Sequence, residues 1–129
     1  MKLVTQHPHS KACMLACVAM IEGVSLQEVI QLAGSDQPPS EDSRRKITEH
    51  FGKEEFYNHR SWRVENYTNR SVGALIKQHT TLLCAVSSSI DPNFAHAVVI
   101  HNNDLYDPHA GMNPTWPWDR VITRVSVIA

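Results

Sequence analysis

The spacing of apolar positions along the chain changes between its first and its second half. Residues 11–22, KACMLACVAMIE, are apolar on nearly every side, which predicts a buried helix with Ser10 as its N-cap and Gly23 just after its end. Residues 25–34 begin with a capping box and carry one apolar face, which predicts a second helix. Residues 41–51 predict a third helix, which is more polar and lies on the surface. The first half is therefore expected to be helical.

The second half consists of short apolar and β-branched runs separated by turn residues. Residues 52–70 show weak periodicity and are expected to be mostly irregular, and a short helix is expected over residues 72–79. The runs that predict strands are TLLCAVSSS, AHAVVIHN, DLYDP and RVITRVSVIA, at residues 81–89, 95–102, 104–108 and 120–129. Helices followed by an antiparallel sheet define an α+β fold.

Length, composition and charge favour a single globular domain over residues 1–129. Of the 129 residues, 42% are hydrophobic and 19% are charged. The formal net charge of −1 leaves no basic excess to neutralise phosphates. No window approaches the roughly 18 consecutive apolar residues of a membrane span. We therefore expect neither a nucleic-acid partner nor a membrane partner.

The cysteine content favours free thiols. Three cysteines form an odd number, which does not suit a disulfide framework. Free thiols suit a reducing compartment, and the polar N-terminal stretch MKLVTQHPHSKA lacks the apolar segment of a signal peptide. A cytoplasmic location is therefore expected.

Cys13 lies near the start of the first predicted helix, about three residues inside it. A helix N-terminus carries a partial positive charge and free N–H groups, and both lower the pKa of a cysteine placed there. Cys17 lies one turn further along and is expected to point into the core, and Cys84 is expected to be a core residue of a strand. By itself, Cys13 is also consistent with a small apolar packing residue.

His96 begins one predicted strand and Asp107 ends the next. If Asn102 and Asn103 form a two-residue loop, Asp107 lies opposite Val98 and diagonal to His96, about 7–8 Å away between Cα atoms. The carboxylate could then orient the imidazole and support its cationic form. A three-residue loop would place the two side chains on opposite faces. Each residue alone also fits a structural role, at a sheet edge or in a turn.

The order of these residues along the chain adds a further argument. A cysteine at a helix start, a histidine on a strand roughly 80 residues later and a polar partner after it follow the order of papain-like thiol hydrolases. Gln6 lies seven residues before Cys13. Its side-chain amide can donate to a developing oxyanion, together with the backbone N–H of Cys13.

Three stretches of the sequence resemble the motifs of one peptidase family. Gln6 followed by CMLACVAMI resembles the N-terminal motif of the papain-like cysteine peptidases that remove double-glycine leader peptides from bacteriocin precursors, and of their stand-alone relatives. In this resemblance Cys13 matches the nucleophile and Gln6 the oxyanion glutamine. AHAVVI resembles the family's histidine strand, with His96 as the base. LYDPHAG resembles its DP…G segment, with Asp107 as the orienting acid.

The resemblance implies a papain-like cysteine protease fold, with N-terminal helices packed on a C-terminal antiparallel sheet. It implies a peptidase, isopeptidase or amidase that acts on a peptide or protein substrate and uses no cofactor and no metal. The family usually has Asp or Asn before the nucleophile and Gly after it, where this chain has Ala12 and Met14. An alternative is an inactive scaffold that binds a protein partner, which a side chain such as Met14 between Cys13 and His96 would favour.

Two further patterns leave other functions open. His7, His9, Cys13 and Cys17 have the ligand types of a zinc site, although such sites usually use closely spaced cysteines in loops. The stretch NPTWPWD at residues 113–119 places two tryptophans between prolines. These rings are expected either to pack over the sheet or to offer an aromatic wall to a peptide or a protein partner.

Overall fold

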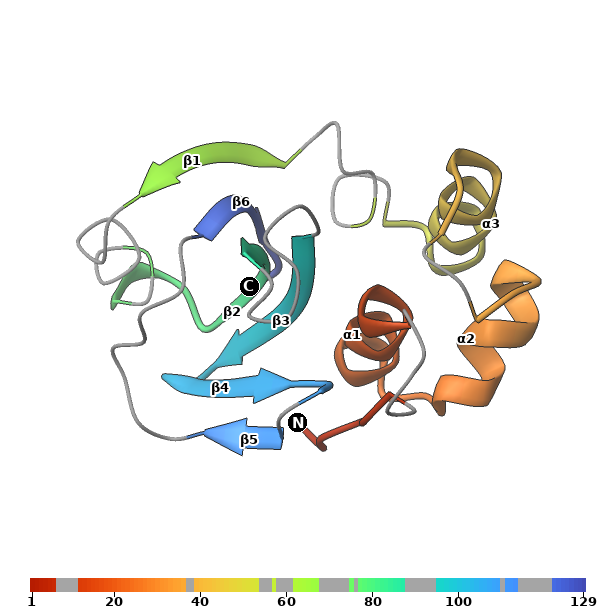
Figure 1. Cartoon of the computed structure of the whole chain (residues 1–129), viewed down its shortest axis with the longest axis horizontal. Helices are drawn as coiled ribbons and strands as arrows, with labels where there is room; N and C mark the ends of the chain where they lie inside the picture. Colours follow the sequence, from red (N-terminus) through yellow and green to blue (C-terminus); the bar gives the residue numbers. More distant parts are fainter. Residues whose placement is uncertain are drawn as a thin grey trace.

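The computed structural model consists of helices in the first half of the chain and a sheet in the second half, which confirms the predicted α+β class (Figure 1). It describes residues 1–6, 12–36, 39–53, 57, 62–67, 75, 77–87, 95–109, 111–113 and 122–129. The helices in these ranges are α1 (Cys13–Glu22), α2 (Leu26–Ala33) and α3 (Glu41–Phe51). The strands are β1 (Arg63–Tyr67), β2 (Thr81–Ser87), β3 (Ala95–His101), β4 (Asp104–Asp107), β5 (Gly111–Asn113) and β6 (Ile122–Val127).

The helix ends follow local capping chemistry. The side chain of Ser25 accepts a hydrogen bond from the backbone N–H of Glu28 at the start of α2, as the capping pattern predicted. Helix α1 ends at Gly23, which adopts the left-handed conformation with φ of 69°, a region that glycine enters without a steric penalty. The start of α1 differs from the prediction, because Ala12 is the N-cap and provides no side-chain hydrogen bond. The predicted cap, Ser10, lies outside the described residues.

The strands form one antiparallel sheet of six strands in the order β1-β6-β2-β3-β4-β5. The expectation that residues 52–70 are mostly irregular was wrong for β1, which pairs with β6 at the edge of the sheet. The register of this pair shifts between Val64 and Tyr67, so the strand lacks the regular alternation that sequence reasoning looks for. The three-residue strand β5, at the other edge, was not predicted either.

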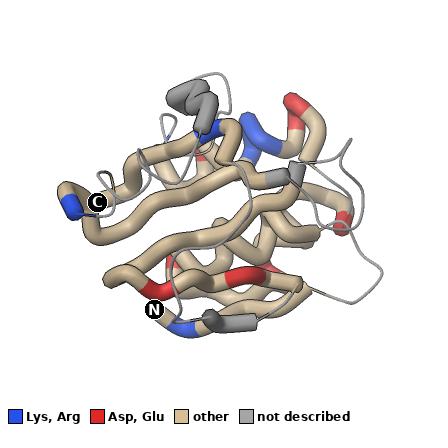
Figure 2. Tube along the Cα trace, turned by 60° about the vertical axis from the view of Figure 1, so that its left-hand side comes forward, with Lys and Arg blue, Asp and Glu red and all other residues tan. Residues whose placement is uncertain are grey.

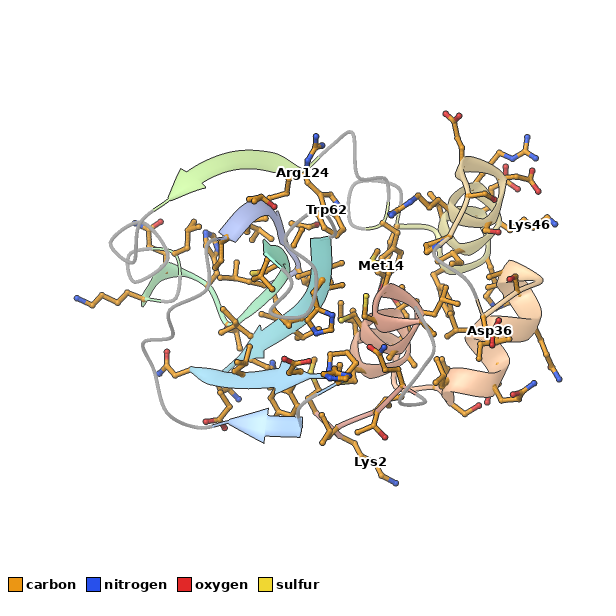
Figure 3. The ribbon with its side chains drawn as sticks, in the orientation of Figure 1. Lys2, Met14, Asp36, Lys46, Trp62 and Arg124 are labelled. Carbon is orange, nitrogen blue, oxygen red and sulfur yellow. The ribbon has the colours of Figure 1, made fainter. Side chains whose placement is uncertain are left out.

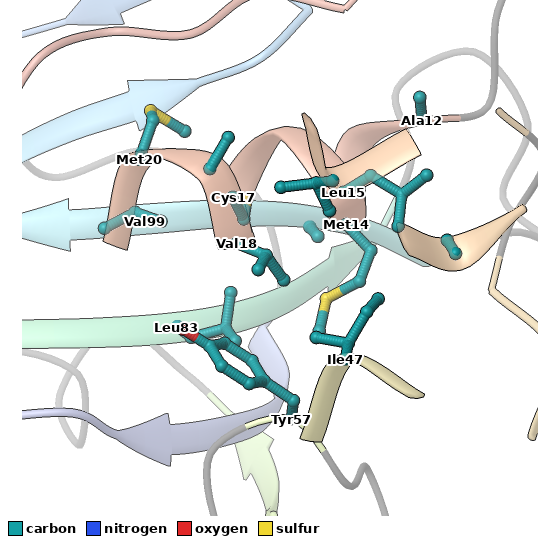
Figure 4. Close-up of a cluster of buried hydrophobic side chains, with 14 of the residues drawn as sticks. Ala12, Met14, Leu15, Cys17, Val18, Met20, Ile47, Tyr57, Leu83 and Val99 are labelled. Carbon is teal, nitrogen blue, oxygen red and sulfur yellow. The ribbon is translucent and has the colours of Figure 1, made fainter. Parts of the chain in front are cut away.

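Helix α1 lies between the sheet and the other two helices (Figure 1). Alternate residues of β2 and β3 divide between two buried clusters, with Leu83 and Val99 on the side of α1 and Leu82 and Val98 on the other side. Figure 4 shows the cluster on the α1 side, which includes residues of α1, α3 and the sheet. Burial on all sides explains why the sequence of α1 is apolar around its whole circumference.

Many charged residues lie on the surface of the described structure, whereas Asp107 is buried. Figure 2 shows acidic and basic positions spread along the trace, and Figure 3 shows the side chains of Lys2 and Lys46 directed outward. Among the described residues, no single helix is long and apolar enough to cross a membrane. Helices α1 and α2 pass that test of length and composition only as a pair, which is bent by 118°.

Candidate active site

Cys13 is the first residue of α1, closer to the helix start than the three residues predicted from the sequence. The difference arises because the helix begins after Ala12. At this position the thiol lies at the positive end of the helix, where the backbone N–H groups have no partners within the helix. The Sγ atom accepts a hydrogen bond from the backbone N–H of Ala97, at 3.5 Å.

The site forms where strands β3 and β4 diverge. Their ladder runs from His101 opposite Asp104 to Val99 opposite Tyr106. Nearer the start of β3, the N–H of Ala97 donates to the Cys13 thiol. The N-terminal end of α1 thus lies beside the part of β3 that β4 leaves unpaired.

The hairpin that carries His96 and Asp107 has the predicted register. Asn102 and Asn103 form the loop, with φ of 50° and 70°, the left-handed conformation that a two-residue hairpin of this kind requires and that asparagine tolerates. The Nε2 atom of His96 lies 2.6 Å from Oδ1 of Asp107, so the predicted contact is confirmed. The backbone N–H of His109 donates to the same carboxylate oxygen at 2.8 Å.

The environment of His96 favours the imidazolium form. Burial by itself would lower the pKa of this histidine. Its hydrogen bonds and charge interactions with Asp107 and Cys13 outweigh burial and raise the pKa to about 9. Because Nε2 is bonded to Asp107, the other ring nitrogen, Nδ1, is the one available to the thiol. His96 therefore links the thiol on one side to the carboxylate on the other.

The Cys13 thiol is the one whose surroundings favour the thiolate. Burial by itself would raise its pKa, but the hydrogen bond with His96, the N–H groups of Ala97 and Met14 and the charge of the imidazolium together lower the pKa below its ordinary value. The pKa values of Cys17 and Cys84 are raised, mainly by burial, and both side chains are fully buried. The expected packing role of these two cysteines is confirmed.

Gln6 lies next to the strand end that carries Asp107. Its backbone N–H donates to the carbonyl of Pro108 at 2.9 Å, which holds the N-terminal segment against the end of β4. The side-chain Oε1 atom is buried. The structure therefore brings Gln6 to the region of the site, and its function as an oxyanion donor stays a prediction.

Met14 occupies a core position away from the thiol. It is 6% exposed and belongs to the cluster on the α1 side, and Figure 4 shows its side chain extending toward Ile47 of α3. Cys13 and His96 each shift the pKa of the other, which indicates that the two side chains face each other, whereas Met14 extends toward α3. Met14 thus fills the space between α1 and α3, which a glycine at this position would leave empty.

Replacing Met14 with alanine is expected to destabilise the protein and to preserve the reactivity of Cys13. Truncating a buried methionine removes apolar contacts and leaves a cavity, which costs roughly 2–5 kcal/mol of unfolding free energy. Urea unfolding measures this loss, and the rate of alkylation by iodoacetamide in native buffer measures the reactivity. A normal stability combined with a changed alkylation rate would contradict the assigned position of Met14.

The structure also brings a residue to the site that sequence reasoning missed. The His109 ring lies edge-on to the His96 ring, with a centroid distance of 6.3 Å, and its backbone N–H fixes the Asp107 carboxylate. The signal was present in the sequence, because an aspartate followed by proline commonly accepts a hydrogen bond from the N–H two residues on.

Other candidate residues fall outside the described ranges. His7 and His9, the possible nitrogen ligands of a zinc site, are among them, as are residues 114–120 with their two tryptophans. Within the described ranges, no group of three or more His, Cys, Asp or Glu residues could hold a metal ion. Cys17, the fourth ligand of the zinc hypothesis, is fully buried and its raised pKa disfavours the thiolate that zinc requires.

No protein-family model matches the sequence, and no curated protein matches it. The arrangement of Cys13, His96 and Asp107 is the feature of the molecule that indicates a function.

Proposed function

We propose that this protein is a cysteine-dependent hydrolase with a papain-like fold, which cleaves a peptide, isopeptide or amide bond in a peptide or protein substrate. The observation that carries the proposal is the continuous chain of contacts from the Cys13 thiol through the His96 imidazole to the Asp107 carboxylate. These are the groups that nucleophilic acyl transfer requires: a nucleophile, a base and an orienting acid. They also occur in the chain order of papain-like enzymes.

In the acylation step, the thiolate of Cys13 attacks the carbonyl carbon of the scissile bond. Its proton resides on His96, whose pKa of about 9 keeps the imidazole protonated at neutral pH. The developing oxyanion accepts hydrogen bonds from the backbone N–H at the start of α1 and from the Gln6 side-chain amide. The carbon–nitrogen bond then breaks as His96 donates its proton to the leaving amine.

In the deacylation step, the neutral His96 removes a proton from a water molecule, which attacks the thioester carbon. The carbon–sulfur bond breaks, the acid product leaves, and the Cys13 thiolate and protonated His96 are regenerated. Asp107 remains a carboxylate throughout and stabilises the imidazolium in both states. The complete cycle uses residues of this chain and water, and we propose that it needs no cofactor or metal.

The alternative of an inactive binding scaffold predicts a side chain between the thiol and the imidazole. The hydrogen bond between Cys13 and His96 and the core position of Met14 argue against it. The proposed cytoplasmic location rests on the three free cysteines, because a reducing compartment keeps cysteine thiols reduced.

Selective alkylation tests the proposal. In native buffer at pH 7, iodoacetamide is expected to label Cys13 rapidly, and Cys13→Ala is expected to remove this fast labelling while the fold is retained. Cys84→Ala is the matched control, because it also removes one thiol but should leave the fast reaction intact. Mass spectrometry of digested protein assigns each modified cysteine. Slow and equal labelling of all three cysteines would contradict the proposed function.

A further inference from the structure

His109 follows Asp107 by two residues and places its imidazole ring against that of His96. The two ring centroids lie 6.3 Å apart and the rings are nearly perpendicular, at 85°. This edge-to-face arrangement lies within the range in which aromatic rings attract each other. His109 is exposed, whereas the side chain of His96 is 13% exposed and that of Asp107 is 3% exposed. The His109 ring therefore lies on the solvent side of a largely buried ion pair.

The position of this ring is fixed by the backbone of the turn that carries it. The N–H of His109 donates to Oδ1 of Asp107 at 2.8 Å. The carbonyl of Pro108 accepts a hydrogen bond from the backbone N–H of Gln6 at 2.9 Å. Asp107 also pairs with Gly111 across strands β4 and β5. These three contacts hold residue 109 beside His96.

The ring of His109 is not needed to form this turn. Any residue except proline supplies the backbone N–H that the Asp107 carboxylate accepts. The turn therefore explains the position of residue 109 but gives no reason for an imidazole side chain there. An alanine at this position should keep the turn and remove the ring, so mutation can separate the two contributions.

The proposed chemistry needs the His96 imidazole in one orientation. Nε2 faces Asp107, at 2.6 Å from Oδ1, which leaves Nδ1 for the thiol. Rotation of a histidine ring about the Cβ–Cγ bond has only a broad, roughly two-fold preference, so this torsion by itself does not select the orientation. A half-turn would present Cδ2 to the thiol and Cε1 to the carboxylate. A ring packed against the imidazole opposes this rotation, because the turning ring has to pass the neighbouring side chain.

We propose that His109 is a positioning residue, whose ring holds the His96 imidazole in the orientation that links the Cys13 thiol to the Asp107 carboxylate. The inference rests on the proposed function and deepens it by adding a residue that exchanges no proton and touches no reacting atom. The role belongs to the ring as a flat packing surface. Phenylalanine should therefore replace His109, and alanine should not.

Alkylation of Cys13 by iodoacetamide tests this inference without a known substrate. The measured quantities are the rate at pH 7 and the pH midpoint of the rate, for the wild type, His109→Ala, His109→Phe and His101→Ala. His101→Ala is the matched control, because His101 lies on the same hairpin and its ring lies edge-on to that of Tyr106, also at a centroid distance of 6.3 Å. Urea unfolding checks that each variant retains the fold.

His109→Ala is expected to lower the alkylation rate at pH 7 by roughly 3- to 10-fold, the effect of losing one edge-to-face ring contact. The pH midpoint should move to higher pH, because an imidazolium that is no longer held beside the thiol lowers the pKa of Cys13 less. His109→Phe should restore most of the rate and return the midpoint toward the wild-type value. His101→Ala should match the wild type in both quantities.

Proton NMR measures the orientation of the imidazole directly. The proton on Nε2 of His96 takes part in the hydrogen bond to Asp107, which protects it from exchange with water. It is expected to give a downfield signal in the wild type, assigned by its loss in His96→Ala. This signal should broaden in His109→Ala, as the ring rotates and the proton exchanges, and should stay sharp in His109→Phe.

An unchanged alkylation rate or an unchanged proton signal in His109→Ala would overturn the inference. An equal fall of the rate in His109→Phe would also overturn it, because the effect would then belong to the polar atoms of histidine, and an equal fall in His101→Ala would reflect damage to the hairpin and overturn it as well. If Cys13 of the wild type reacts no faster than Cys17 and Cys84, the proposed function fails and the inference fails with it. If Cys13 reacts fast at a rate independent of His109, only the inference fails.

Discussion

Replacing His96 with alanine is expected to lower the rate of amide hydrolysis by roughly 10² to 10⁴-fold, the usual contribution of a positioned acid–base group. The variant also loses the hydrogen bond and the charge that lower the pKa of Cys13. The burial of the thiol remains and then raises that pKa. The alkylation of Cys13 by iodoacetamide at pH 7 should therefore slow together with hydrolysis.

A time course of alkylation followed by mass spectrometry measures this effect. His101→Ala is a suitable control, because His101 lies on the same strand and its Nδ1 is bonded to Thr81 at the other end of the hairpin. This control should alkylate at the wild-type rate. If both variants slowed equally, the effect would reflect damage to β3 and not the loss of the base.

Replacing Asp107 with asparagine is expected to move the alkaline limit of activity to lower pH. In the wild type, His96 is protonated below its pKa of about 9 and loses its proton as the pH rises through this value. The amide removes the hydrogen bond to the carboxylate and its charge, which are among the causes that raise this pKa. At pH 8, a smaller fraction of the molecules then carries a protonated His96 that can donate its proton to the leaving amine. The value of kcat/KM therefore falls first at this alkaline pH.

The pH profile of kcat/KM, measured with any amide substrate found for the wild type, checks this prediction. The rate of iodoacetamide alkylation is the internal comparison, since it needs the thiolate and no proton donor and should not decline at alkaline pH. Asp104→Asn is the control on the same strand, away from His96. An alkaline limit at the same pH in Asp107→Asn would show that the carboxylate does not set the protonation of His96.

The hairpin of the site could be predicted from the sequence because its geometry depends on neighbouring residues. Asn102 and Asn103 both tolerate the left-handed conformation, and their number fixes the register that brings Asp107 to His96. The position of Cys13 relative to the first residue of its helix was harder to predict from the sequence. The cap is Ala12, a residue with no capping side chain, so no signal marks this helix start.

Other features depend on tertiary placement and carry no local signal. Strand β1 has a polar sequence, RVENY, and lies at the edge of the described sheet, where it pairs with β6 through an irregular register. Arg44 and Arg45 are adjacent and chemically identical in the sequence. In the structure Arg44 is half-buried and donates to the Tyr57 carbonyl, whereas Arg45 is exposed and pairs with Asp42, because the two side chains leave α3 on different sides.

The contact between Cys13 and Ala97 joins residues 84 positions apart. Each group that lowers the thiol pKa, apart from the N–H of Met14, comes from β3 and reaches Cys13 only after the sheet has formed. During synthesis on the ribosome, Cys13 emerges long before His96 and Asp107. A nascent or unfolded chain thus carries Cys13 as an ordinary thiol. Under the proposed function, the reactivity of this thiol arises only with folding, so an incomplete chain would not cleave other proteins.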